Sequence, residues 1–198
     1  MWALWAVIHE RGIDGVTFRA VAAEAGVSIG RIQHYFESKE HLIRCGAEEM
    51  VVGAEQVYRE RESDADPRSA LEALLTHPVP TTAPSRIGAS VWYAYLARVS
   101  DPWIRSFITD ASRGTVRETE RLLGRGGLTG EHAHLAAMRL VALSNGVTQS
   151  VLVAAMDADD AIRVIIQEID RTFDDTDGPI ASRTGPAELT YGRTRPGR

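Results

Sequence analysis

The strongest constraint on the fold lies in residues 17–42, which read TFRAVAAEAGVSIGRIQHYFESKEHL. Here the small residue Ala22 is followed four positions later by Gly26, and the apolar residues Val27 and Ile32 come next. A small residue lets two helices cross closely, a glycine allows the turn between them, and apolar residues hold the second helix against the first. The stretch therefore predicts a helical hairpin of the helix-turn-helix type.

The rest of the chain also shows helical periodicity, without the alternation typical of a half-buried strand. Gly12 is placed to end a first helix, while Thr17, Ser28 and Ser38 are placed to cap the next three. We expect an all-α fold. Its helices should cover residues 2–11, 17–25, 28–35, 38–61, 68–76, 84–99, 102–124, 130–156 and 160–174. Residues 177–198 are rich in glycine and proline, so we expect a disordered tail there.

Charge and cysteine usage limit the class of protein. The formal net charge of −5 argues against a protein that coats nucleic acid through charge alone. A lone cysteine, Cys45, excludes an internal disulfide and favours a reducing compartment. The apolar start MWALWAVIHERG has no basic leader, and no apolar run is long enough to cross a bilayer. We therefore expect a cytoplasmic protein with no membrane partner.

The acidity is not spread evenly along the chain. Residues 17–44 carry four cations against three glutamates, which leaves this stretch with one net positive charge. A local reading surface for nucleic acid is therefore compatible with an acidic chain, because the sign of the charge matters only where contact is made.

The segment GVTFRAVAAEAGVSIGRIQHYFESKEHL resembles the N-terminal domain of the TetR family of bacterial transcriptional regulators. The resemblance rests on the Thr-x-Arg opening at 17–19, the AGVSxG turn at 25–30, HYF at 34–36 and SKEHL at 38–42. With the first helix it covers about residues 1–45. It implies an all-α, roughly nine-helix protein, with a three-helix DNA-binding domain at 1–45 and a ligand-binding and dimerisation domain at 46–176.

Residue chemistry agrees with DNA contact in this stretch. Hydroxyls at helix N-termini can hold a phosphate beside free backbone N–H groups, and a lysine can clamp another. On the short third helix, an arginine can pair with guanine and a glutamine with adenine. The family resemblance adds a supporting or backbone-contacting role for Tyr35. The predicted DNA-binding residues are Thr17, Arg19, Ser28, Ile29, Arg31, Gln33, His34, Tyr35 and Lys39.

Simpler interpretations stay open for single members of this set. Thr17 and Ser28 also serve as plain helix caps, and His34 alone fits an ordinary surface position. Two features depart from the family pattern. Gln33 stands where a tyrosine is common, and the given sequence begins almost inside its first helix. Either contacts from a basic N-terminal arm are missing, or the true start lies upstream.

Aromatic residues gather in VWYAYLARVSDPWIRSF, residues 91–107. Aromatic rings with a few polar tips suit a pocket for a small organic ligand, although an aromatic core explains each of them equally well. The segments SVWYAYLARVSDPWIR and RLVALSNGVTQSVLV also resemble the C-terminal domain of BetI-type members, which implies a pocket without naming its occupant. The predicted ligand-binding residues are Trp92, Tyr93, Tyr95, Trp103 and Phe107.

Helix-turn-helix heads of this kind bind two half-sites as a dimer, so some surface must join two copies. Apolar lines on the last two expected helices are candidates for a four-helix bundle, as the family resemblance also implies; packing within one chain is the alternative. The predicted interface residues are Leu135, Met138, Ala142, Val147, Val151, Ile162, Ile165, Ile169 and Phe173.

We therefore expect a ligand-responsive DNA-binding transcriptional regulator. Following the family's commoner habit, it would be a repressor that binds a palindromic operator as a homodimer and is released by a small organic effector. A ligand-binding helical dimer without DNA reading, and a small helical enzyme, are the alternatives. The chain lacks a glycine-rich phosphate loop, Cys-x-x-Cys and His-Glu-x-x-His, so we expect no catalytic residues, no cofactor and no metal. The aspartates at 157, 159 and 160 are interpreted as a helix cap, with calcium binding as the alternative.

Overall fold

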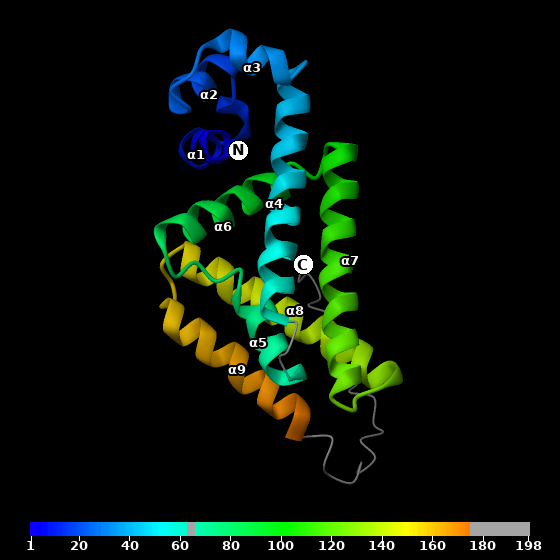
Figure 1. Cartoon of the computed structure of the whole chain (residues 1–198). Helices are drawn as coiled ribbons and strands as arrows, with labels where there is room; N and C mark the ends of the chain where they lie inside the picture. Colours follow the sequence, from blue (N-terminus) through cyan, green and yellow to red (C-terminus); the bar gives the residue numbers. More distant parts are fainter. Residues whose placement is uncertain (63–65, 175–198) are drawn as a thin grey trace, which may run out of the picture.

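The computed structural model of the chain describes residues 1–62 and 66–174, and the tail predicted for 177–198 lies outside them. Over the described residues the protein forms nine α-helices and no strand, which confirms the predicted fold class. Figure 1 shows the helices in their order along the chain. Their bounds are α1 Trp2–Arg11, α2 Phe18–Glu24, α3 Ile29–Tyr35, α4 Lys39–Glu62, α5 Pro67–Thr76, α6 Ala83–Leu96, α7 Pro102–Arg125, α8 Gly130–Leu152 and α9 Ala158–Asp174.

Helices α1 to α3 form a small unit at one end of the molecule, called the head below (Figure 1). Gly12 ends α1 with a φ of 69°, and Gly26 makes the turn between α2 and α3 with a φ of 64°, a region where glycine has no steric penalty. A short 3-10 turn, Ile13–Gly15, precedes α2 and was not predicted. Thr17 and Ser28 cap α2 and α3 as their positions indicate.

Helix α4 leaves the head and runs along the larger body, which consists of α5 to α9 (Figure 1). Two body helices end earlier than predicted. Helix α6 stops at Leu96, because the amides of Arg98 and Val99 bond to carbonyls three residues back and form a turn. Helix α8 stops at Leu152, where Ala154 adopts a φ of 57° and Ala155 donates to the Ser150 carbonyl. A helix end with a left-handed residue usually carries a glycine, and none stands at this position in the sequence.

Two apolar clusters hold the fold together. One lies among α5, α7, α8 and α9 in the body, with Leu71, Leu122, Leu140 and Ile165 fully buried. The other begins in the head and continues into α6 and α7, where Tyr95 is fully buried. The head therefore shares its core with the body instead of hanging from a flexible link. None of the described helices is long and apolar enough to pass through a membrane.

Candidate functional site

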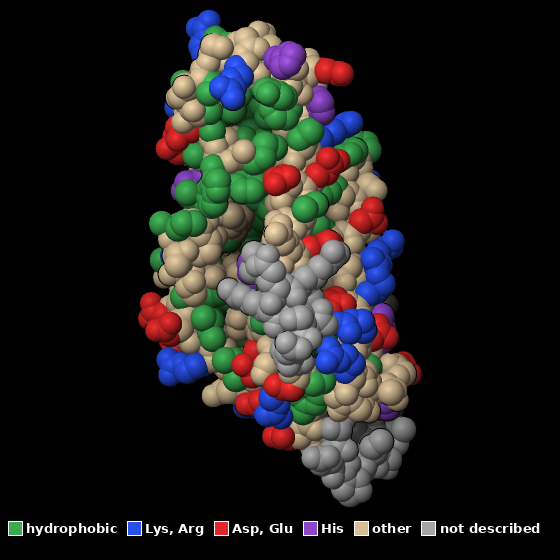
Figure 2. All heavy atoms as spheres, viewed as in Figure 1, with side chains coloured by type: hydrophobic (Ala, Val, Ile, Leu, Met, Phe, Trp, Pro, Cys, Tyr) green, Lys and Arg blue, Asp and Glu red, His purple; other side chains and the backbone are tan. Residues whose placement is uncertain are grey.

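The exposed side of α3 is the first candidate surface. Within this helix only Ile32 is buried, while Ile29, Gln33, His34 and the other predicted contact residues face solvent. Tyr35 is 64% exposed, which is unusual for so large an apolar ring, and it packs edge-on against His34 at 5.2 Å between ring centroids. In Figure 2, basic, histidine and acidic side chains stand among hydrophobic and other atoms at the end of the molecule where Figure 1 places α3.

Hydroxyl side chains cap the N-termini of the two helices at this surface, α2 and α3. The Thr17 hydroxyl oxygen accepts from the Ala20 amide at 3.1 Å, and the Ser28 oxygen accepts from the Arg31 amide at 3.3 Å. Both residues are exposed. A hydroxyl that accepts one such bond keeps its own proton as a donor. Capping and phosphate contact are therefore compatible roles for the same oxygen.

Lys39 is tied to the loop that precedes α2. Its Nζ donates to the Asp14 carbonyl at 3.0 Å, and the Asp14 carboxylate pairs with Arg98 Nη1 at 2.5 Å. An ammonium has three donors, so Lys39 keeps two for another acceptor. Arg98 lies two residues after the end of α6, so this group of three residues joins the body to the head, a link that the sequence did not indicate.

Most of the predicted ligand-binding aromatics pack against one another between α4, α6 and α7. The Tyr95 hydroxyl donates to the Ile43 carbonyl at 2.7 Å, and burial raises the pKa of this phenol well above its ordinary value. Trp103 stacks on Phe107 at 5.4 Å with 8° between the rings, and the Arg44 guanidinium lies 5.1 Å from the Trp103 ring centre. With Trp92 they belong to the apolar cluster of the head, which matches the core alternative.

Tyr93 is the member of the predicted set that lines a hollow. Its hydroxyl donates to the Asn145 carbonyl of α8 at 2.8 Å, and partial burial raises the pKa of the phenol. The hollow, called the seam hollow below, has a volume of about 430 Å³ and lies between α1, α6 and the end of α8. Its lining residues are His9, Arg86, Ser90, Tyr93, Gln149, Leu152 and Val153.

The seam hollow joins the head to the body. The His9 Nδ1 atom of α1 lies 2.6 Å from the Ser90 Oγ atom of α6, at hydrogen-bond distance. Apart from Tyr93, sequence reasoning missed the residues of this site; His9 and Ser90 stand 81 positions apart and neither belongs to a local motif. Helical periodicity marks both only as ordinary polar positions.

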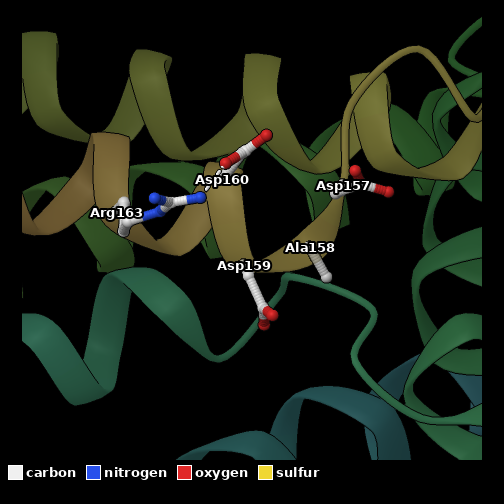
Figure 3. A pocket seen from close by; sticks show the side chains of 5 residues that line it. All are labelled: Asp157, Ala158, Asp159, Asp160 and Arg163. Atoms are coloured by element: carbon white, nitrogen blue, oxygen red, sulfur yellow. Dashed lines mark hydrogen bonds and ion pairs between the residues drawn. The ribbon is translucent and has the colours of Figure 1, made fainter.

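A second hollow lies at the start of α9 and is lined by Asp157, Ala158, Asp159, Asp160 and Arg163. Figure 3 shows the three carboxylates pointing in different directions, with Asp160 paired to Arg163. The described part of the chain holds no group of three histidine, cysteine or acidic residues arranged to bind a metal ion. The calcium alternative therefore gains no support from this cluster.

Some of the predicted interface residues are exposed at the surface, and others are buried in the core of the body. On α8, Leu135 and Met138 are 55% and 50% exposed and Ala142 is also exposed, whereas Val147 and Val151 are buried in the body. The step of five residues from 142 to 147 turns the side chain by about 140° around the helix, so the predicted line could not keep one face. On α9, Ile165 and Ile169 are fully buried and Ile162 and Phe173 are half-buried against the same cluster. The four buried residues cannot contact a partner in this fold.

A helix-turn-helix head that shares its core with a larger helical body is the architecture of a DNA-binding regulator. Comparison with protein families agrees: residues 3–44 match the model described as bacterial regulatory proteins, tetR family, and residues 67–174 match the BetI-type transcriptional repressor C-terminal domain. The chain belongs to the TetR family, so it is a transcriptional regulator with a DNA-binding head and a ligand-binding body. The family consists of regulators, not enzymes.

Individual relatives are distant but extend over most of the chain. The HTH-type transcriptional regulator PksA of Bacillus subtilis is 28% identical over 85% of both chains. The regulator BetI of Proteus mirabilis is 30% identical over 73% of this chain and 74% of its own. A solved transcriptional regulator from Rhodococcus sp. Rha1 has a TM-score of 0.76 at 24% identity, covering 88% of this chain and 94% of that one. This last likeness concerns the fold.

Proposed function

We propose that the protein is a repressor that binds a palindromic operator as a homodimer and leaves it when a small organic ligand binds the body. The observation that carries the proposal is the polar face of α3. Arg31, Gln33 and His34 are exposed on this helix, while Ile32 fixes it to the head from the other side. We expect this protein to act in the cytoplasm, where its DNA partner is found.

The chemistry of α3 suits a helix lying in the major groove. Arg31 stands in its first turn, and in helix-turn-helix proteins the start of the recognition helix contacts base edges. The capped starts of α2 and α3 offer backbone N–H groups, a positive helix end and hydroxyl donors to phosphates on either side of the groove. Arg19 and Lys39 would add cationic contacts to the same backbone.

Dimer formation is supported by apolar side chains that the described residues leave uncovered. Leu135, Met138 and Ala142 form one exposed line on α8, and Val164 of α9 is 36% exposed. Burial of a large apolar side chain stabilises an association by about 1.5–3 kcal/mol. We therefore assign the interface to this line, and leave Val147, Val151, Ile165 and Ile169 to the core.

Release by an effector requires a mechanical link between body and head. Three contacts supply it: Trp5 Nε1 donates to the Gly46 carbonyl at 3.1 Å, Tyr95 bonds to Ile43, and Arg98 pairs with Asp14. A ligand that favours a different position of α4 would change the first two contacts, and one that favours a different position of α6 would change the last two. Only such differential binding shifts the population of head orientations.

The test is a shift assay on the DNA upstream of the protein's own gene. We expect a complex that weakens as salt is added, because phosphate contacts release counterions. Arg31→Ala should cost about 1–3 kcal/mol at the cognate site and relax the sequence preference, whereas Lys39→Ala should weaken all sites alike. Arg113→Ala, an exposed arginine on α7, is the matched control and should leave binding unchanged. Equal loss of specific and nonspecific binding by Arg31→Ala would contradict base reading there.

The dimer is tested separately by light scattering. Met138→Glu should shift the protein towards a monomer and weaken binding to a two-half-site operator. Val52→Glu is the control, because Val52 is 57% exposed and lies on α4, a different helix from the proposed interface line. A Met138→Glu protein that keeps the molecular mass of a dimer would refute this interface.

A further inference from the structure

We propose that the seam hollow is a binding site for a small amphipathic anion, such as a short-chain carboxylate. The site as such follows from the lining residues, and its effect on DNA binding rests on the proposed function.

The lining has cationic and donor groups without an opposing charge. None of the seven described lining residues is acidic, while Arg86 contributes a guanidinium and His9 an imidazole. Arg86 stands in the first turn of α6, is exposed, and has no carboxylate within ion-pair distance among the described residues. The Gln149 side chain adds an amide donor. A guanidinium with five donors in a planar fork recognises a carboxylate through two parallel bonds.

The other side of the hollow is apolar. Leu152 and Val153 end α8 there, and Val153 is 68% exposed although it is a large apolar side chain. The half-buried Tyr93 ring forms part of the same wall, with its hydroxyl already used by Asn145. The volume of about 430 Å³ falls within the range of about 300–1,000 Å³ usual for ligand sites. A ligand with one anionic end and a short hydrocarbon chain matches both sides.

The seam hollow lies between the head and the body, so a ligand bound there would affect how the two parts contact each other. Its ligand would contact α1 of the head through His9 and the body through α6 and α8. A carboxylate that competes for the His9 ring also weakens the bond between His9 and Ser90, one of the contacts that set the head on the body. Binding at this site and DNA affinity are then coupled through the orientation of α1.

The experiment measures ligand binding without DNA, by titration calorimetry on the full chain at low salt. Sodium hexanoate is the probe; 1-hexanol and hexyltrimethylammonium, which have an alkyl chain of similar length but no anionic group, are the comparison ligands. We expect hexanoate to bind, the alcohol to bind at least threefold more weakly, and the ammonium not to bind. Because the site is open, hexanoate affinity should also fall as sodium chloride is raised towards 0.5 M.

Variants locate the site. Arg86→Gln should lower the affinity for hexanoate about three- to tenfold, as expected for the loss of one partly exposed charge-assisted contact. Arg86→Glu should abolish hexanoate binding. The matched controls are Arg113→Gln and Arg113→Glu on α7, which change the net charge equally but lie outside the hollow. No binding of hexanoate, equal binding of the three probes, or equal effects at positions 86 and 113 would each overturn the proposal.

The same proteins separate this inference from the proposed function. Adding hexanoate to the operator complex should lower DNA affinity for the unchanged chain and for Arg113→Gln, but not for Arg86→Glu. Hexanoate that binds through Arg86 without changing DNA affinity would support the site and refute effector release through it. A chain that binds no operator but still binds hexanoate through Arg86 would refute the proposed function and leave the site supported.

Discussion

Tyr95→Phe is the substitution whose outcome the structure specifies most fully. The Tyr95 side chain is 0% exposed, and its hydroxyl donates to the Ile43 carbonyl at 2.7 Å, which links α6 to α4. Phenylalanine keeps the ring and removes the hydroxyl alone. The Ile43 carbonyl lies inside α4 and also serves the helix's own hydrogen bonds, so the substitution does not leave it without a donor.

The stability difference between the Tyr95→Phe variant and the unchanged protein should become smaller as the pH rises. Near pH 7 the lost hydrogen bond should lower the free energy of unfolding by about 0.5–1.5 kcal/mol. Burial raises the folded-state pKa of Tyr95 well above the unfolded value of 10.0. Above pH 10 the unfolded chain therefore loses the proton while the folded protein keeps it, and stability falls as the pH rises. By pH 11 this loss reaches about 1.4 kcal/mol, and the phenylalanine variant does not suffer it.

The assay is urea unfolding of both proteins at pH 7, 9, 10 and 11 and one protein concentration, because the proposed dimer would make stability concentration-dependent. The variant should be less stable at pH 7 and 9, and the difference should shrink to near zero or reverse by pH 11. Other titrating groups occur in both proteins and cancel in the comparison. A difference that stays constant from pH 7 to pH 11 would show that Tyr95 is not a buried, protonated donor.

Two further predictions concern the head and its packing on α4. Gly46→Ala should destabilise the protein by about 1–3 kcal/mol in thermal unfolding, because a new methyl group would meet the Leu4 side chain and the Tyr95 hydroxyl. Gly53→Ala in the same helix has open space around it and should be neutral or stabilise by up to about 1 kcal/mol; similar losses at both positions would contradict close packing of α1 on α4. Ser28→Ala should cost about 0.5–2 kcal/mol of stability through the lost cap of α3, with Ser28→Thr retaining most of it. An unchanged melting temperature for Ser28→Ala would mean that the cap does not support α3.

Local signals determined the head almost completely. Helix α1 has the bounds predicted from its apolar period and from Gly12, and the caps at Thr17 and Ser28 lie where their side chains indicate. Caps and tight turns are decided by neighbours within four residues, so a single sequence contains the necessary information. Ala154 shows the limit of prediction from local signals, because alanine rarely adopts the left-handed conformation that ends α8 there.

In the body, helical periodicity alone could not decide which apolar residues are buried in the core and which are exposed. An apolar residue on a helix predicts burial without saying against what, so Val147 and Leu135 looked equivalent until the fold placed one in the core and the other on the surface. The aromatic residues at 92–107 were likewise open to two interpretations, and packing between α4, α6 and α7 put Tyr95 in the core. Of the residues that line the seam hollow, Tyr93 was predicted as ligand-binding, and the other six carried no sequence signal.

The sequence by itself determined the helices, the reading head and the family, because these depend on local periodicity, capping and a motif of fixed spacing. Only the tertiary structure decided which apolar faces remain exposed and which distant residues meet. His9 and Ser90 form one contact across 81 positions because α1 packs on α6, and chain folding, not residue type, sets that distance.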